Sequence, residues 1–98
     1  MGEPSAKAAN ALHRHLANPF WVLDLPPDTP ADRVERQGEM LLSMLALGVV
    51  DASRYQTPLG SRERTAEIVR EAMAELRDPN RRLAHEWWVR EEGGSANV

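Results

Sequence analysis

Apolar residues recur at helical spacing in two long stretches of the chain. In residues 30–47, four positions at intervals of three and four share one side of a helix: Val34, Gly38, Leu41 and Leu45. A second stretch, over about residues 62–77, repeats this spacing with Thr65, Ile68 or Val69, Ala72, Met73 and Leu76. The pattern predicts two amphipathic helices, separated by a loop over residues 48–60.

Residues at the ends of these stretches predict where each helix begins and ends. Thr29 can cap the first helix, with Pro30 at its first position, and Ser61 can cap the second. Asp78-Pro79 ends the second helix, because the residue before a proline avoids the helical region. Gly38 in mid-helix costs roughly 1 kcal/mol relative to alanine, so we expect it to allow a close helix crossing.

Three shorter helices are predicted around this pair. Ser5 can cap an alanine-rich helix over residues 6–17. The apolar run from Phe20 to Leu25 is too short to assign by periodicity alone; because no partner strand is evident, we expect a short buried helix. A last helix over about residues 80–91 bears Leu83, Trp87 and Trp88, and a glycine-rich, flexible tail follows.

Length and composition agree with one small soluble domain. The 98 residues carry a net charge of -3, which argues against a general nucleic-acid binder. The chain has no cysteine, which excludes disulfides, thiolate zinc sites and cysteine nucleophiles. No apolar run approaches the roughly 20 residues of a membrane span, and no secretory signal is evident, so a cytoplasmic protein is expected.

Two segments far apart in the chain resemble the conserved ends of a J-domain. The aromatic opening is Phe20-Trp21-Val22-Leu23, and the closing stretch holds Glu71-Ala72-Met73, Leu76, Asp78-Pro79, Arg81-Arg82 and His85-Glu86. The residues that carry the resemblance are Phe20, Trp21, Leu23, Ala72, Leu76, Asp78, Pro79 and Arg82. The implied fold is all-α: two long antiparallel helices with short flanking helices, over residues 18–91, preceded by a helical extension (1–17) and followed by a tail (92–98).

The motif through which J-domain co-chaperones act is replaced here. The resemblance places their His-Pro-Asp motif, which stimulates a heat-shock ATPase, at Ala46-Leu47-Gly48. The second helix of the family is usually basic, whereas residues 30–47 contain two arginines and three acidic residues, 2 - 3 = -1. The resemblance therefore implies the fold without the activity.

An apolar ridge beside the lost motif is the main candidate binding site. Met40, Met44 and Leu47 follow one another at i, i+4 and i+7, on the flank of the predicted core stripe. Methionine side chains adapt to varied shapes and recur at binding surfaces. Two interpretations are open: the ridge binds a partner protein or a second copy, or the helix over 6–17 covers it with Leu12 and Leu16.

The C-terminal half offers two further features. Trp87 and Trp88 point about 100° apart on a helix, so one can enter the core while Trp88 anchors an interface; alternatively, both pack inside. Six arginines interleave with glutamates and read as a solvated face rather than a phosphate-binding stripe: Arg62, Arg64, Arg70, Arg77, Arg81 and Arg82. Arg81 and Arg82 are expected to stabilise the helix junction or to pair with nearby carboxylates.

Signs of catalysis or metal binding are weak. His13 and His15 lie on different helix faces, and His85 is far along the chain, so no metal site and no cofactor are predicted. Ser43, Ser53 and Ser61 lack a histidine and carboxylate at recognisable spacing, so no enzyme is predicted. The expected function is a protein–protein interaction module: an adaptor, an assembly factor or a complex subunit. The alternatives are an atypical co-chaperone or regulator of the heat-shock ATPase, and a nucleic-acid-associated accessory protein.

Overall fold

The computed structural model describes residues 18–94, with side chains to residue 91. The elements, in chain order, are α2 (Pro19–Leu23), α3 (Ala31–Ala46), the 3-10 helix η1 (Val50–Ser53), β1 (Arg54–Thr57), β2 (Gly60–Glu63), α4 (Ala66–Arg77) and α5 (Pro79–Gly94). The helix predicted over residues 6–17, with its covering role, and the end of the tail lie outside the described residues. The last helix continues three residues beyond its predicted end, through Gly94.

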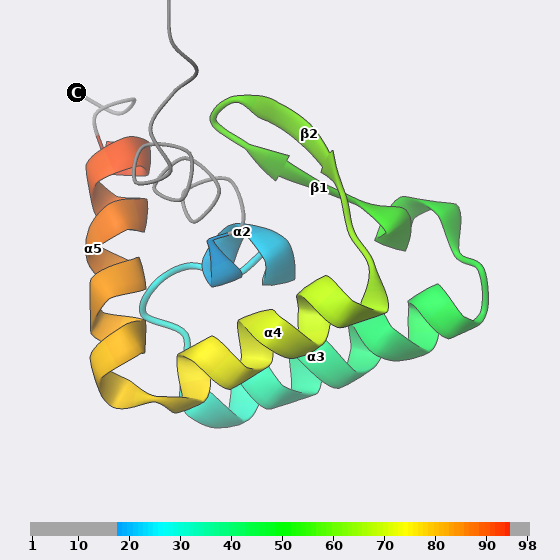
Figure 1. The fold of residues 1–98 in the computed structure, drawn as a ribbon, viewed down its shortest axis with the longest axis horizontal. Coiled ribbons are helices and arrows are strands. Elements are labelled where there is room, and N and C mark those ends of the chain that lie inside the picture. Colours follow the sequence, from blue (N-terminus) through cyan, green and yellow to red (C-terminus); the bar gives the residue numbers. More distant parts are fainter. Residues whose placement is uncertain (1–17, 95–98) are drawn as a thin grey trace, which may run out of the picture.

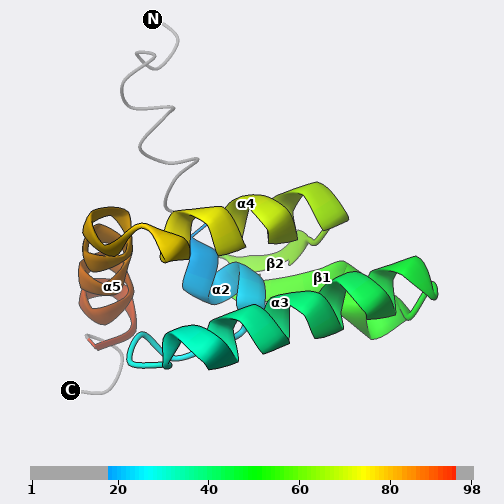
Figure 2. The same cartoon turned by 90° about the horizontal axis from the view of Figure 1, so that it is seen from below.

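The two long helices lie side by side and antiparallel, as predicted. α3 and α4 form one layer, α2 lies across them, and α5 crosses the end of the pair that is farthest from η1 (Figures 1 and 2). α3 contributes Val34, Gly38 and Leu41 to the core. A Cβ atom on Gly38 would collide with the Met73 thioether, so this glycine allows the close crossing that the sequence predicts.

α2 is a five-residue helix that forms the centre of the core. The Asn18 side chain caps it by accepting from the Phe20 amide at 3.0 Å, and Asp24 ends it in the left-handed conformation with φ 57°. Phe20 and Leu23 are fully buried, and Val69 of α4 belongs to the same buried cluster. The prediction of a short buried helix in this segment is therefore confirmed.

The prediction of a loop with weak local order over residues 48–60 is wrong. Residues 54–63 form an antiparallel β-hairpin in which Arg54 pairs with Glu63 and Thr57 pairs with Gly60. Its strands have four residues each, and Tyr55 is the one apolar residue they bury, so the alternation typical of a strand is nearly invisible in the sequence. The described fold is thus mostly helical with a small two-stranded sheet, rather than all-α.

Both predicted helix starts also need correction. The hydroxyl of Thr29 donates to the Pro26 carbonyl at 2.7 Å and closes a turn, so α3 begins after Pro30 without a side-chain cap. Ser61 lies in β2, and α4 begins only at Ala66. Its cap is Thr65, whose hydroxyl accepts from the Ile68 amide at 3.2 Å. The sequence pattern had instead placed Thr65 on the buried side of the helix.

Two arginines from distant parts of the chain hold α2 in place. Arg64, expected in the solvated face, is instead 6% exposed and donates to the carbonyls of Val22 and Ala52, at 2.8 and 3.1 Å. On the other side, Arg82 lies over the Phe20 ring, 5.6 Å from its centroid, and donates to the carbonyls of Pro27 and Thr29. Burial lowers the pKa of the Arg64 guanidinium, which nevertheless stays charged because its ordinary pKa is so high.

Candidate partner-binding face of α3

One side of α3, turned away from its core stripe, combines arginines and exposed apolar residues. Its members recur at helical spacing and are named here the α3 face: Arg33, Arg36, Gln37, Met40, Met44 and Leu47. Met40 is 48% exposed and Leu47 is 80% exposed, while Met44 is partly buried. The three apolar residues predicted for partner binding therefore share one face, and arginines that the prediction did not include extend it.

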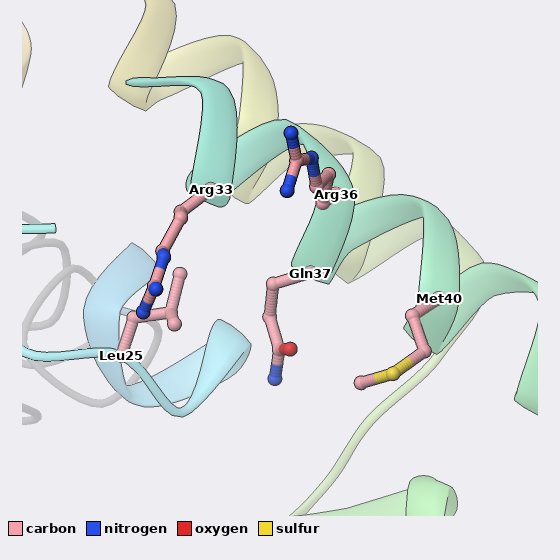
Figure 3. A pocket seen from close by; sticks show the side chains of 5 residues that line it. All are labelled: Leu25, Arg33, Arg36, Gln37 and Met40. Carbon is pink, nitrogen blue, oxygen red and sulfur yellow. The ribbon is translucent and has the colours of Figure 1, made fainter. Parts of the chain in front are cut away.

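The N-terminal half of the α3 face borders a shallow groove of about 320 Å³. Leu25, from the segment after α2, lies beside Arg33 on one side of the groove, and Met40 lies on the other side of Gln37 (Figure 3). The Gln37 side chain donates to the Leu23 carbonyl at 2.9 Å, which ties α3 to the end of α2. The groove thus has a fixed polar centre between two apolar walls.

Charges on α3 are segregated rather than mixed. Glu35 points to the opposite side, where Arg77 of α4 donates to it at 2.9 Å and lowers the pKa of its carboxyl group. Arg36 lies on the groove side and pairs with Asp32 at 3.8 Å, but both side chains are largely exposed, so this pair is weak. The net charge of -1 predicted for this helix therefore conceals a cationic patch at the groove.

The position at which the J-domain resemblance places the His-Pro-Asp motif lies at the end of α3. The helix ends at Ala46, Leu47 follows as its C-cap, and Gly48 takes a positive φ of 75° that a residue with a side chain rarely adopts. Val50, at the start of η1, is 78% exposed beside this turn. Sequence reasoning missed Val50, although the apolar run that continues past Gly48 was a visible signal.

Trp88 does not join this face. It belongs to α5, which lies at the other end of the α3–α4 pair from Leu47 (Figure 1). The prediction that one tryptophan enters the core is wrong, because Trp87 is 55% exposed, Trp88 is 47% exposed and Val89 takes the buried position. Their rings meet edge to face, with centroids 4.9 Å apart.

The residues behind the J-domain resemblance gather around α2 and at the α4–α5 junction. Phe20, Leu23, Ala72 and Leu76 are buried together in the core, and Trp21 packs against it. The Asp78 carboxylate accepts from the Asn80 amide at 2.9 Å and begins α5, whose first residue is Pro79. These positions form the structural centre of the domain rather than a reactive site.

Charged side chains at this junction pair with one another. Glu75 lies 2.8 Å from Arg81 and 3.1 Å from the His85 ring; hydrogen bonding to His85, then to Arg81, lowers the pKa of the Glu75 carboxyl group. Arg82 lies 3.5 Å from Glu86. The expectation that Arg81 and Arg82 pair with nearby carboxylates is confirmed, and the guanidinium groups used here are not arranged as a phosphate-binding stripe.

Histidines and serines were considered above for metal binding and nucleophilic catalysis. Those that the structure describes form no metal-binding group or have structural roles. Within residues 18–94, no group of three or more histidine or acidic side chains could hold a metal ion. His13 and His15 lie outside the described residues. The Ser53 hydroxyl donates to the Val50 carbonyl at 2.6 Å, and the Ser61 hydroxyl accepts from Arg54 at 3.0 Å, so both support the hairpin region.

The α3 face is suited to contact with another macromolecule. It offers guanidinium donors at one end and exposed aliphatic side chains at the other, on a helix whose neighbouring side is fixed in the core. Across the described residues, no helix is both long and apolar enough to cross a membrane. No family model matches this chain, and no curated protein and no solved structure matches it.

Proposed function

We propose that this protein is a non-catalytic interaction module that binds another protein through the α3 face. The partner segment that fits carries apolar side chains next to carboxylates, because the face changes from Arg33 and Arg36 to Met40 and then to Leu47. The adaptor, assembly factor or complex subunit expected from the sequence would use such a face. The scaffold we propose is J-domain-like.

The observation that carries the proposal is that large aliphatic side chains are exposed to solvent, outside the hydrophobic core. Leu47 is 80% exposed and Val50 is 78% exposed, at the turn that ends α3. Contiguous exposed apolar residues bordered by polar groups mark interaction sites more often than isolated ones do. The guanidinium groups add charge complementarity, which favours a partner with acidic residues and speeds association.

The resemblance to J-domains supports the location of this binding face. In that family the corresponding helix and the motif after it contact the heat-shock ATPase. Leu47 here replaces the central residue of that motif, so contact with a partner is retained in our proposal while the stimulating chemistry is lost.

The binding experiment compares variants that fold equally well. Immobilised protein, with Leu47→Asp as the test variant and Leu59→Asp as the control, is exposed to a cell extract and washed; Leu59 is 66% exposed at the hairpin turn. We expect one stoichiometric partner that the parent and the control retain and Leu47→Asp loses. Retention of the same proteins by all three chains would exclude the α3 face.

A second candidate function is regulation of the heat-shock ATPase without its activation. The arginines segregated to the groove side favour it, because the family's corresponding helix is basic. Steady-state ATPase assays with the chaperone and a true J-domain protein that stimulates it decide between the two. We expect this chain to leave the stimulated rate unchanged; a change in that rate, lost in an Arg33→Glu, Arg36→Glu double variant, would favour the regulator.

A further inference from the structure

The outward side of α5 is a second apolar surface, separate from the α3 face. Four residues at helical spacing, named here the α5 face, are exposed: Leu83, Ala84, Trp87 and Trp88. Leu83 is 64% exposed, and the two tryptophans are about half exposed. None of the four carries a charge, so this side of the helix is apolar over about two turns.

The opposite side of α5 fixes this face in position. Val89 is 7% exposed in the core, and His85 and Glu86 point toward the rest of the fold with side chains 13% and 18% exposed. The backbone carbonyl of His85 also accepts from the Asn18 side chain at 3.3 Å. The tryptophans are therefore presented by an ordered helix, and a partner would find them already positioned.

The size of the α5 face fits the centre of a small interface. Each half-exposed indole offers roughly 100 Å² and Leu83 a similar area, on the order of 300 Å² in all. A standard interface takes about 800 Å² from each partner, so the bordering polar residues are needed to complete it. Those residues are exposed at both ends of the face: Asn80, Arg81, Arg90 and Glu91. The expected complex is specific but weak.

We propose that the α5 face binds the α5 face of a second copy, with the two helices antiparallel. A two-fold axis brings the same patch of both copies together, so the patch must complement itself. In the register centred between residues 85 and 86, Ala84 of each copy lies opposite Trp87 of the other. The small side chain of Ala84 leaves room for the indole of Trp87, while Leu83 and Trp88 lie on the two flanks of the interface.

The ends of the helix fit the same arrangement. Antiparallel pairing puts Asn80, at the positive end of one helix dipole, opposite Glu91 near the negative end of the other. Arg81 and Arg90 lie on opposite flanks of α5, so like charges do not meet across the two-fold axis. This end-to-end polarity favours a second copy over a uniformly acidic or basic partner.

Sedimentation velocity of the full chain at concentrations from about 1 to 500 µM tests the proposal. We expect the mean mass to rise from one copy toward two, and Trp88→Glu to raise the dissociation constant at least tenfold. Leu59→Asp and Leu47→Asp should both stay dimeric, which separates this surface from the α3 face. Circular dichroism confirms that each variant is folded.

Single cysteines test the orientation, because the native chain has none. An antiparallel pair cross-links an equimolar mixture of Asn80→Cys and Glu91→Cys, since these positions lie opposite each other, and cross-links either variant alone much less. Stronger cross-linking within each single variant would overturn the antiparallel register. A full chain that stays monomeric throughout would overturn the dimer; if deletion of residues 1–17 then permits association, the face belongs to that segment instead.

Discussion

The Arg64 side chain donates to the backbone carbonyl of Val22, 2.8 Å away, although the two residues are 42 positions apart. This bond joins the start of the chain's described part to the segment between β2 and α4. The same guanidinium holds the Ala52 carbonyl and lies over the Tyr55 ring, 5.8 Å from its centroid. A buried cation thus connects α2, η1 and the hairpin.

Replacing Arg64 with leucine should destabilise the protein substantially. The substitution removes two charge-assisted hydrogen bonds and leaves the carbonyls of Val22 and Ala52 buried without these donors, which costs about 2–4 kcal/mol. Urea unfolding measures the change. The control is Arg70→Leu on the exposed side of α4, expected to change the free energy of unfolding by less than about 0.5 kcal/mol. Equal changes in the free energy of unfolding would contradict the structural role described for Arg64.

Gly38→Ala should also destabilise, against the ordinary preference for alanine in helices. Helix propensity alone would favour alanine by roughly 1 kcal/mol, but the new methyl group would overlap the Met73 thioether. We expect a net loss of about 1–3 kcal/mol, the usual cost of overpacking. In a double-mutant cycle with Met73→Ala, the two changes should be strongly coupled. Simple additivity would show that Met73 moves aside without cost.

Glu75 should make the stability of the protein depend on acid pH. The His85 and Arg81 contacts lower the pKa of its carboxyl group below the ordinary 4.5 in the folded state. The stabilisation is therefore present above about pH 4.5 and is lost as the pH falls through the lower, folded-state pKa. The gap in unfolding free energy between the parent and Glu75→Gln should therefore stay constant down to about pH 4.5 and close as the pH falls further. Glu71→Gln, on the exposed side of α4, should show no such convergence.

Asn18→Ala should weaken the start of α2. The variant loses the side-chain cap on the Phe20 amide and the 3.3 Å bond to the His85 carbonyl. We expect a loss of about 1–2 kcal/mol, as for other N-cap replacements. Asn18→Asp separates the two contributions, because aspartate keeps the cap acceptor and loses the donor to α5. An Asn18→Ala variant with the parent's unfolding free energy would exclude a structural role for this side chain.

The helices were predictable because periodic patterns and helix ends determine them locally. The core stripe of α3 follows from the sequence pattern, as does the break at Asp78-Pro79. The short helix at Phe20 was instead assigned because no partner strand was evident. The close α3–α4 crossing at Gly38 was also predictable, because a glycine in mid-helix needs a reason in packing. These features depend on neighbours in the chain, which the sequence displays directly.

The hairpin and the buried arginine were not predictable by the same reasoning. A four-residue strand with one buried side chain leaves no alternating pattern, so Tyr55 alone could not indicate β1. Arg64 lies in a run of charged residues that suggests a solvated face, and its burial depends on carbonyl groups far away in the sequence. The charge segregation on α3 was hidden for a related reason: a net count ignores which side each charge occupies.

The two arginines that hold α2 also set an order of events during synthesis. Five residues cannot hold a helix by themselves. The groups that fix α2 are the Arg64 donor to the Val22 carbonyl and the Arg82 guanidinium over the Phe20 ring. The Phe20 segment therefore leaves the ribosome before Arg64 and Arg82 have been synthesised. This apolar segment, the centre of the finished core, stays unprotected until the last helix emerges, and folding of the domain is completed from its C-terminal end.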